Sequence, residues 1–480
     1  MLVMEIIYLC SLSAWFIQYI LPARLRTRYR LINTGLCLVI FFVHLAAGYP
    51  RWQLAALYLT QLFLLVRTIT GLVKSSRLSV KTDRTPLPVS LGFISFLLMI
   101  GLTLYTNWAV PLTRIPPPTG PYTTGTTRFI LTDPARRETL TPADQTGSRR
   151  IVVQAWYPAG DITNQPLAPY IPGQLSSFAR AAAALMQTPV FVYSHLAYLS
   201  THSRLDAPVQ PGYWPVVIFS PGYGATEYLY TAILEELASY GYILFSLNHP
   251  YDSLCTWFGA EDEAVMQPPG LRQGECSALR GFRRLMREEA SLDIRMRRMQ
   301  AIQACTAAFP TAALAVRLAD IRCLAGLLPQ PTAAGMDLFD GHLDLHRLAV
   351  CGHSLGGVAA TRVCLEPGPF KAGVNLDGFV FTMDWDSRLQ VPFYFIYTTA
   401  NLHPITGETL DSTGMNSILA DLARAETRSL ALPGTRHLDF TDSLYLFPVL
   451  RLMGQHGAMP PHQFRFAVTG ALLEFFQQQL

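Results

Sequence analysis

The chain has 480 residues, of which 50% are hydrophobic and only 15% are charged, and its formal net charge is +4. Residues 1–110 contain ten basic and two acidic residues, whereas the remainder contains 27 basic and 31 acidic residues. Because the basic surplus lies between apolar stretches, it indicates membrane topology and argues against nucleic acid as a partner. The length allows a large folded domain beside a membrane segment.

Four apolar stretches follow one another near the N-terminus, at residues 6–21, 31–48, 52–73 and 87–106. Each is close to the ~20 residues that a helix needs to cross a bilayer, so the sequence predicts an α-helical transmembrane domain of about four spans. Arg67 interrupts the third stretch, which leaves a three-span or re-entrant arrangement as an alternative. Core helices of a soluble protein are a further alternative, but four blocks with almost no charge argue against it.

The loops between these stretches predict their orientation. Basic residues gather in two loops, with Arg24, Arg26, Arg28 and Arg30 in the first and Lys74, Arg77, Lys81 and Arg84 in the third. The second loop offers only Arg51. Because basic loops remain in the cytoplasm, we expect a multi-pass protein of the cell membrane, with the lipid bilayer as a partner and the later domain extracytoplasmic.

A proline-rich linker is expected after the last stretch. Residues 115–122, IPPPTGPY, combine three consecutive prolines with a glycine, a composition typical of an extended spacer. We therefore divide the chain into a transmembrane helical domain at residues 1–110, a linker at 111–127 and a large folded domain at 128–480.

Short strands alternate with amphipathic helices in the third part. The expected strands are residues 151–157, 215–220, 242–247, 348–351, 372–376, 391–397 and 428–432, and a helix is expected at 226–240. This alternation predicts an α/β fold with a mostly parallel sheet and helices on both faces. An insertion at 252–310, with a charged helical stretch at 280–300, is interpreted either as a lid or as a solvated surface helix.

The sequence Gly352-His353-Ser354-Leu355-Gly356 directly follows one expected strand. Small residues from Gly357 onward can open a helix. A G-x-S-x-G sequence between a strand and a helix is typical of the nucleophile turn of an α/β-hydrolase, where little bulk is tolerated beside the serine. The pattern alone is weak, but this context makes Ser354 the candidate nucleophile.

The acid and the base of such an enzyme follow the serine, each after a strand. Asp377 ends the strand at 372–376, and His437 lies in the loop after the strand at 428–432. We expect these two residues to complete a catalytic triad with Ser354. Other downstream candidates lack this placement, namely Asp384, Asp386, Asp411, Asp421, His456 and His462, while His353 lies inside the turn itself.

Two backbone amides are expected to form the oxyanion hole. One belongs to Leu355, immediately after the nucleophile, and the other lies in the loop at 220–224, where we favour Tyr223. Each such donor typically contributes ~10²–10³ in turnover.

Residues 117–480 resemble the platelet-activating factor acetylhydrolase family (isoform II, plasma type), α/β hydrolases that need no calcium and cleave short or oxidised acyl chains from phospholipids. The matching segments are PTGPYTTGT, WYPA, FSPGYGATEYLY, LASYGYILFSLNHPYD, LADIRCLAGLL, GHSLGG, NLDG and HLDF. The resemblance implies the same triad and oxyanion residues. Family members commonly have a histidine at the position of Pro221, and the N-terminal membrane segment lies outside the resemblance.

The chain contains eight cysteines. Cys255 and Cys276 of the insertion are candidates for a disulfide outside the cytoplasm, whereas Cys323, Cys351 and Cys364 fit small core residues. His342, Asp344 and His346 lack a metal-binding spacing and are expected in a surface loop. We expect no metal and no cofactor.

The sequence thus predicts a membrane-anchored serine hydrolase that acts on a carboxylic ester. By resemblance, the substrate is a phospholipid ester similar to that of 1-alkyl-2-acetylglycerophosphocholine esterases. One alternative is a general carboxylesterase, lipase or thioesterase for soluble or polymeric esters. Another is a membrane sensor with an inactive hydrolase-like domain.

Overall fold

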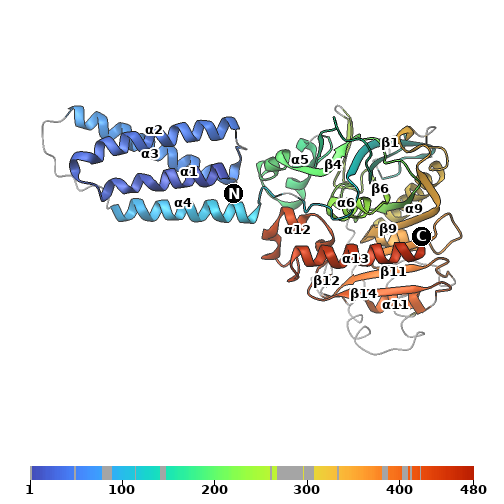
Figure 1. The fold of residues 1–480 in the computed structure, drawn as a ribbon. Helices are drawn as coiled ribbons and strands as arrows, with labels where there is room; N and C mark the ends of the chain where they lie inside the picture. The colour runs from blue at the N-terminus through green and yellow to red at the C-terminus, as the bar shows by residue number, and fades with distance from the viewer. Residues whose placement is uncertain are drawn as a thin grey trace. The chain divides into compact units, whose positions relative to one another are not determined.

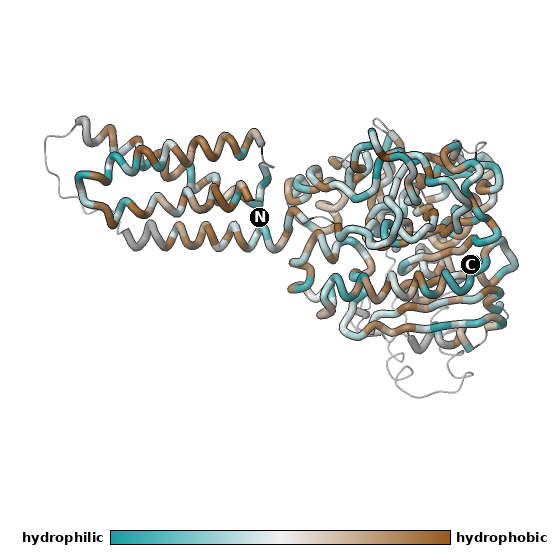
Figure 2. Tube along the Cα trace, viewed as in Figure 1, coloured by the Kyte–Doolittle hydropathy of each residue, from teal (hydrophilic) through white to brown (hydrophobic). Residues whose placement is uncertain are grey.

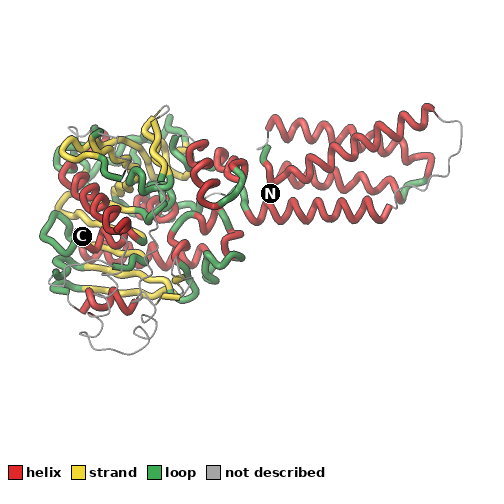
Figure 3. Tube along the Cα trace, turned by 180° about the vertical axis from the view of Figure 1, so that it is seen from behind, coloured by secondary structure: helices red, strands yellow, loops and turns green. Residues whose placement is uncertain are grey.

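The computed structural model describes residues 3–47, 50–77, 89–113, 115–140, 147–173, 175–259, 262–266, 296, 308–331, 335–380, 387–399, 401–402, 409–410, 413–421 and 423–480. The chain forms two compact units. One comprises Met1–Thr113, Phe191–Tyr198 and Leu446–Val449, and the other comprises Arg114–Val190, Leu199–Tyr445 and Leu450–Leu480. The first unit is helical, whereas the second combines strands and helices (Figures 1 and 3).

The helical unit is built from α1 (Val3–Ala14) with a 3₁₀ turn at Trp15–Tyr19, α2 (Ala23–Ala47), α3 (Ala55–Arg77) with a 3₁₀ turn at Trp52–Leu54, and α4 (Val89–Ala109). Tyr8, Leu57 and Phe96 belong to its interior. Large apolar side chains are exposed on its helices, such as Phe42 on α2 and Leu59 on α3. Figure 2 shows hydrophobic residues along the helices of this unit. A helix in water presents a polar outer face, so this apolar outer face is typical of helices in lipid.

Two of the four predicted spans are long and apolar enough to cross a membrane, namely Arg24–Ala46 and Trp52–Val73. The apolar helices at the other two positions, Val3–Tyr19 and Ile94–Ala109, are shorter in the part of the chain that the structure describes. The structure therefore supports two candidate spans rather than four, by length and composition alone.

The structure also corrects the expected first loop. Arg24, Arg26, Arg28 and Arg30 belong to the first turns of α2. Arginine is a strong helix former, so the helix begins well before its apolar stretch. Lys74 and Arg77 likewise lie in the last turns of α3.

A buried ion pair joins Glu5 of α1 to Arg51, which precedes the 3₁₀ turn before α3. The guanidinium of Arg51 lies 2.6 Å and 2.9 Å from the two carboxylate oxygens of Glu5, and it also donates to Asn107 over 2.9 Å. Glu5 and Arg51 are both buried. The charge of Arg51 is therefore compensated inside the unit.

The second unit contains a ten-stranded sheet in the order β14-β11-β10-β9-β5-β6-β2-β1-β4-β3. The strands are β1 (Thr124–Arg137), β2 (Ser148–Pro158), β3 (Leu167–Pro169), β4 (Ser200–Leu205), β5 (Trp214–Ser220), β6 (Ile243–Asn248), β9 (Leu343–His353), β10 (Ala372–Leu376), β11 (Phe393–Thr398) and β14 (Thr427–Leu432). The six strands from β14 to β6 are parallel, whereas β2 runs antiparallel to both β6 and β1. The mostly parallel α/β sheet predicted from the sequence is confirmed.

The helices of the described part of the unit are α5 (Leu175–Met186), α6 (Thr231–Ser239), α9 (Ala308–Leu327), α10 (Leu355–Val363), α11 (Thr413–Asp421), α12 (Ser443–Leu446) and α13 (Pro461–Gln479). Helices α6, α9, α10 and α11 contact this sheet. A hydrophobic core cluster joins residues of α9 and α10 to alternate residues of β5, including Val216 and Ile218. On the sheet, α6 contacts β2 and β6, and it also contacts α13. These layers hold the strand ends that carry the candidate site.

Several strands were not expected from the sequence, in particular β1 and β4, which lie near the antiparallel edge of the sheet. The expected insertion begins with an antiparallel hairpin, β7 (Cys255–Gly259) and β8 (Asp262–Val265). A second short hairpin joins β12 (Asn401–Leu402) and β13 (Thr409–Leu410). Apart from residue 296, the charged stretch at 280–300 lies outside the described residues.

Candidate active site

Ser354 lies in a sharp turn between β9 and α10. Its φ of 56° is in the left-handed region that non-glycine residues rarely adopt, which is the strain expected of a nucleophile turn. A Cβ atom on Gly352 would lie 2.2 Å from the carbonyl oxygen of Gly356, and one on Gly356 would lie 1.9 Å from that of Ser220. Only glycine fits at either position, which explains the spacing found in the sequence.

The structure brings together the three side chains expected to form a triad. Nε2 of His437 lies 2.8 Å from Oγ of Ser354, and Nδ1 of His437 lies 2.7 Å from Oδ2 of Asp377. With Nδ1 protonated toward the carboxylate, Nε2 is left to accept the serine proton. This is the arrangement that makes a serine alcohol nucleophilic.

Hydrogen bonds from Thr398 hold Asp377 beside His437. Asp377 follows β10 with a φ of 53°, and its carboxylate is buried. The backbone N–H of Thr398 donates to Oδ1 over 2.8 Å, and the Thr398 hydroxyl donates to Oδ2 over 2.9 Å. Because these donors come from the end of the neighbouring strand β11, the sheet itself orients the carboxylate.

The loop that carries His437 is fixed by a second carboxylate. Asp439 accepts hydrogen bonds from the backbone N–H of Arg436 over 2.8 Å and from that of Gly457 over 3.1 Å. It also contacts Nδ1 of His456 at 2.9 Å. His456, a rejected candidate base, therefore supports the loop that holds His437.

His353 links three segments of the site. Its Nε2 lies 3.1 Å from the carbonyl oxygen of His437, so Nε2 carries the hydrogen and Nδ1 accepts one from the Tyr230 hydroxyl over 2.9 Å. The same hydroxyl accepts the backbone N–H of Gly222 over 2.9 Å. Burial, and then the nearby His437, hold the pKa of His353 well below its usual value, so the ring stays neutral. Neutral His353 therefore joins the serine turn, the base loop and the loop at 220–224.

The loop expected to provide an oxyanion amide lies directly against Ser354. A Cβ on Gly222 would lie 3.3 Å from the Cβ of Ser354, which places the neighbouring Tyr223 backbone beside the serine. Leu355 is the first residue of α10, and the first amides of a helix have no acceptor within it. The two amides expected from the sequence thus belong to adjacent segments.

Arg317 of α9 is a residue that the sequence interpretation missed. Its guanidinium donates to the carbonyl oxygens of Pro221 and Gly222, the latter over 3.1 Å. Asp252 pairs with the same guanidinium at 2.6 Å and 2.8 Å. By fixing these carbonyls, Arg317 orients the peptide units of the loop that includes Tyr223. A charged residue inside the apolar run of α9 was the signal that could have revealed it.

A second polar cluster supports the same loop. His249 contacts the Ser220 hydroxyl through Nε2 at 3.0 Å and Asp320 through Nδ1 at 2.9 Å, and Arg149 pairs with Asp320 at 2.7 Å. Burial first, and then Arg317, lower the pKa of His249 to about 4. His249 is therefore neutral, and its contact with Asp320 is a hydrogen bond rather than an ion pair.

Other candidates from the sequence are engaged elsewhere. Asp344 accepts the backbone N–H of His346 and pairs with Arg347, while His342 contacts the Gly212 carbonyl. In the described ranges of the chain, no group of three or more metal-binding side chains occurs.

The remaining expectations concern cysteines and alternative acids. Cys351 and Cys364 are buried, and Cys323 is partly buried. Cys255 is buried, and burial raises the pKa of its thiol to about 12. Cys276, its predicted disulfide partner, lies outside the described residues. Asp421 is the last residue of α11. The other acids considered lie outside the described residues, namely Asp384, Asp386 and Asp411.

Known proteins resemble the part of the chain that carries this candidate site. The profile of the family described as platelet-activating factor acetylhydrolase, isoform II, matches residues 109–480. The platelet-activating factor acetylhydrolase of Cavia porcellus is 25% identical over 366 residues, which cover 72% of this chain and 72% of that protein. The protein of the same name from Gallus gallus is 24% identical over 394 residues, covering 76% and 84%.

A solved structure shares the fold. The ferulic acid esterase from Streptomyces cinnamoneus superimposes with a TM-score of 0.57 at 23% identity, covering 77% of this chain and 93% of that one. At this identity the similarity shows the hydrolase-like α/β fold alone.

Proposed function

The chain belongs to the platelet-activating factor acetylhydrolase, isoform II, family and is an ester-hydrolysing serine hydrolase, and from this premise we propose that it cleaves a phospholipid acyl ester while anchored in a membrane. The proposed catalytic residues are Ser354, His437 and Asp377. The substrate class follows from relatives named as platelet-activating factor acetylhydrolases.

In the proposed reaction, Oγ of Ser354 attacks the ester carbonyl while Nε2 of His437 takes its proton. Asp377 keeps the ring in the required tautomer and stabilises the imidazolium. The carbonyl oxygen, now negative, accepts hydrogen bonds from the amides of Tyr223 and Leu355, each typically contributing ~10²–10³ in turnover.

The tetrahedral intermediate then collapses. The ester C–O bond breaks, and the leaving alcohol receives the proton from Nε2 of His437. Water, deprotonated by the same nitrogen, attacks the acyl-Ser354 ester and releases the carboxylic acid. Ser354 regains its proton, so the residues return to their starting state.

The observation that carries this proposal is the unbroken hydrogen-bonded series from Ser354 through His437 to Asp377, at 2.8 Å and 2.7 Å. The Thr398 donors and the neutral His353 support it, since both fix the geometry of that series.

For the anchor, we propose that residues 1–110 hold the chain in the membrane, with both basic segments cytoplasmic and the catalytic domain at 128–480 outside. The apolar outer face of α2 and α3 supports a lipid environment. The segment between these helices holds a single basic residue, Arg51, which is far fewer than either basic segment carries. A reporter fused after Val110 should be active outside the cytoplasm, and activity only inside would contradict the orientation.

The substrate proposal is tested with purified full-length protein. Hydrolysis of 1-alkyl-2-acetylglycerophosphocholine in vesicles is compared with hydrolysis of p-nitrophenyl acetate and butyrate, and Ser354→Ala is the matched variant. We expect a higher kcat/KM for the phospholipid, lost in the variant. Turnover of soluble esters alone would instead identify a general carboxylesterase, and absence of all turnover would favour an inactive sensor.

A further inference from the structure

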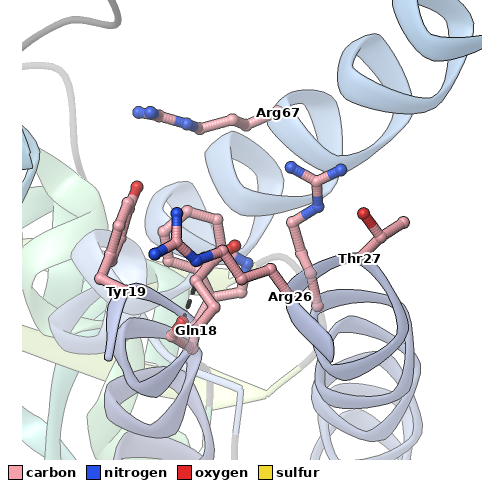
Figure 4. A pocket seen from close by; sticks show the side chains of 7 residues that line it. Gln18, Tyr19, Arg26, Thr27 and Arg67 are labelled. Atoms are coloured by element: carbon pink, nitrogen blue, oxygen red, sulfur yellow. Dashed lines mark hydrogen bonds between the residues drawn. The ribbon is translucent and has the colours of Figure 1, made fainter. Parts of the chain in front are cut away.

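A basic pocket lies within the helical unit, and none of the residues proposed for catalysis lines it. It has a volume of about 310 Å³ and is lined by Trp15, Gln18, Tyr19, Arg26, Thr27, Arg30 and Arg67. These side chains come from the 3₁₀ turn after α1, from the start of α2 and from α3 (Figure 4). The volume is in the range of small-ligand sites.

The three arginines of the pocket have no acidic partner among the residues that the structure describes. Arg26 donates to the carbonyl oxygen of Leu21, and Arg67 lies over the ring of Trp15 at 5.9 Å. Neither contact neutralises a charge. Glu5, an acidic residue of this unit, is already paired with Arg51. Three guanidinium groups around one pocket therefore create a positive potential that favours an anion.

Two buried hydrogen-bond donors belong to residues that line this pocket. Nε of Arg30 and the indole Nε1 of Trp15 are enclosed and have no hydrogen-bond partner among the described residues. A buried donor without an acceptor costs free energy, so a bound group that supplies oxygen acceptors would remove this cost.

The helix packing also makes room for one of the arginines. A Cβ on Gly71 of α3 would lie 2.8 Å from Nη2 and 3.1 Å from Nη1 of Arg30. Glycine inside a helix is less stable than alanine, but alanine at position 71 would clash with the guanidinium of Arg30. Gly71 therefore leaves space for that guanidinium.

The position along the chain indicates the kind of anion. Arg26 and Arg30 lie at the start of one candidate span, and Arg67 lies near the end of the other. Trp15 and Tyr19 add the aromatic side chains that favour the membrane–water interface. Basic pockets between helices at this depth bind lipid phosphates, and arginine pairs with phosphate in bidentate geometry.

We propose that this pocket binds the phosphate of an anionic phospholipid headgroup. The ligand is distinct from the ester substrate, and the site does not depend on the proposed hydrolase chemistry. Its role is to hold the helical unit at a defined depth in an anionic leaflet.

The test is native mass spectrometry of the full-length protein in detergent. Dioleoyl phosphatidic acid is titrated against dioleoyl phosphatidylcholine, with glycerol 3-phosphate as a soluble phosphate. Arg30→Gln/Arg67→Gln is compared with Arg24→Gln/Arg28→Gln, which removes the same charge from exposed positions outside the pocket. We expect roughly thirtyfold weaker phosphatidic acid binding in the first variant and about threefold or less in the second.

Thermal unfolding of each variant verifies folding. Gly71→Ala is a second test, since it keeps every charge and favours the helix, but its added methyl group would clash with the guanidinium of Arg30. This variant should also bind phosphatidic acid more weakly. Equal binding of both lipids by the unmodified protein, or equal losses in the two double variants, would overturn the site. Glycerol 3-phosphate binding as tightly as phosphatidic acid would overturn the lipid assignment in favour of a soluble phosphate.

Discussion

Arg317 and Asp252 form an ion pair in which neither side chain has exposed surface. The pair lies against the carbonyl groups of Pro221 and Gly222, so a buried charge interaction fixes the loop beside Ser354. Removing one member of a buried pair leaves the other charge uncompensated, which is far more costly than losing a surface pair. The geometry of the proposed oxyanion hole therefore depends on α9.

We expect Arg317→Met to lower kcat by about 10²-fold or more, with a smaller change in KM, because the Tyr223 amide loses its orientation toward the transition state. Kinetics with p-nitrophenyl acetate, below the melting temperature of the variant, measure both constants. Arg322→Met is the control, since Arg322 lies on the same helix in an exposed pair with Glu366. An unchanged kcat in Arg317→Met would contradict the role of this loop.

Tyr230→Phe should reduce stability by about 1–3 kcal/mol, because Gly222 loses a buried acceptor and His353 loses its donor. We also expect a fall in kcat, since the three linked segments carry the nucleophile, the base and one oxyanion amide. Tyr213→Phe, at an exposed position, is the matched control. Equal melting temperatures for the two variants would show that the Tyr230 hydroxyl does not connect these segments.

The stability of the hydrolase unit should depend on pH through His249. Its pKa is lowered to about 4 in the folded protein, against about 6.5 in an unfolded chain. A lowered folded-state pKa means that the stabilising contribution is complete above pH ~6.5 and is lost as pH falls toward ~4. The full contribution corresponds to about 3 kcal/mol.

Denaturant unfolding between pH 4 and pH 7.5 measures this dependence. The stability difference between the unmodified protein and His249→Gln should shrink as the pH falls through this window. His346→Gln, which changes an exposed histidine, is the matched control. A constant difference for His249→Gln across the window would show that this ring does not have the inferred pKa.

Asp377→Asn should lower kcat on the order of 10⁴-fold, because an amide does not hold His437 in the tautomer that accepts the serine proton. Thr398→Val is a graded comparison, since it removes one donor to the carboxylate and keeps the charge. We expect a loss of about tenfold or less in that variant. Similar losses in both would assign Asp377 to packing rather than to orientation of the base.

Much of the candidate site could be anticipated from local sequence. Gly352 and Gly356 mark the turn because any Cβ there would clash with backbone, and this constraint is visible as a spacing. Asp377 and His437 were found because each follows an apolar strand, and the parallel strands of a sheet end at one edge.

The remaining contacts depend on tertiary packing that no local pattern encodes. Asp252 and Arg317 are 65 residues apart, and Tyr230 and His353 are 123 apart. Strands such as β4 were missed because the antiparallel edge of the sheet has no long apolar run. The start of α2 was misplaced because its first turns carry arginines, which form helix readily but resemble a loop in a hydropathy pattern.

The most direct test of the proposed chemistry is to locate the covalent adduct of a fluorophosphonate on the purified protein. Such probes react with a serine only when a base activates it. We predict a single modified site at Ser354 by peptide mass spectrometry, with labelling abolished in His437→Ala. An active protein that carries the adduct on another serine, or that hydrolyses esters with Ser354 unmodified after saturation by the probe, would contradict the assignment of Ser354 as the nucleophile.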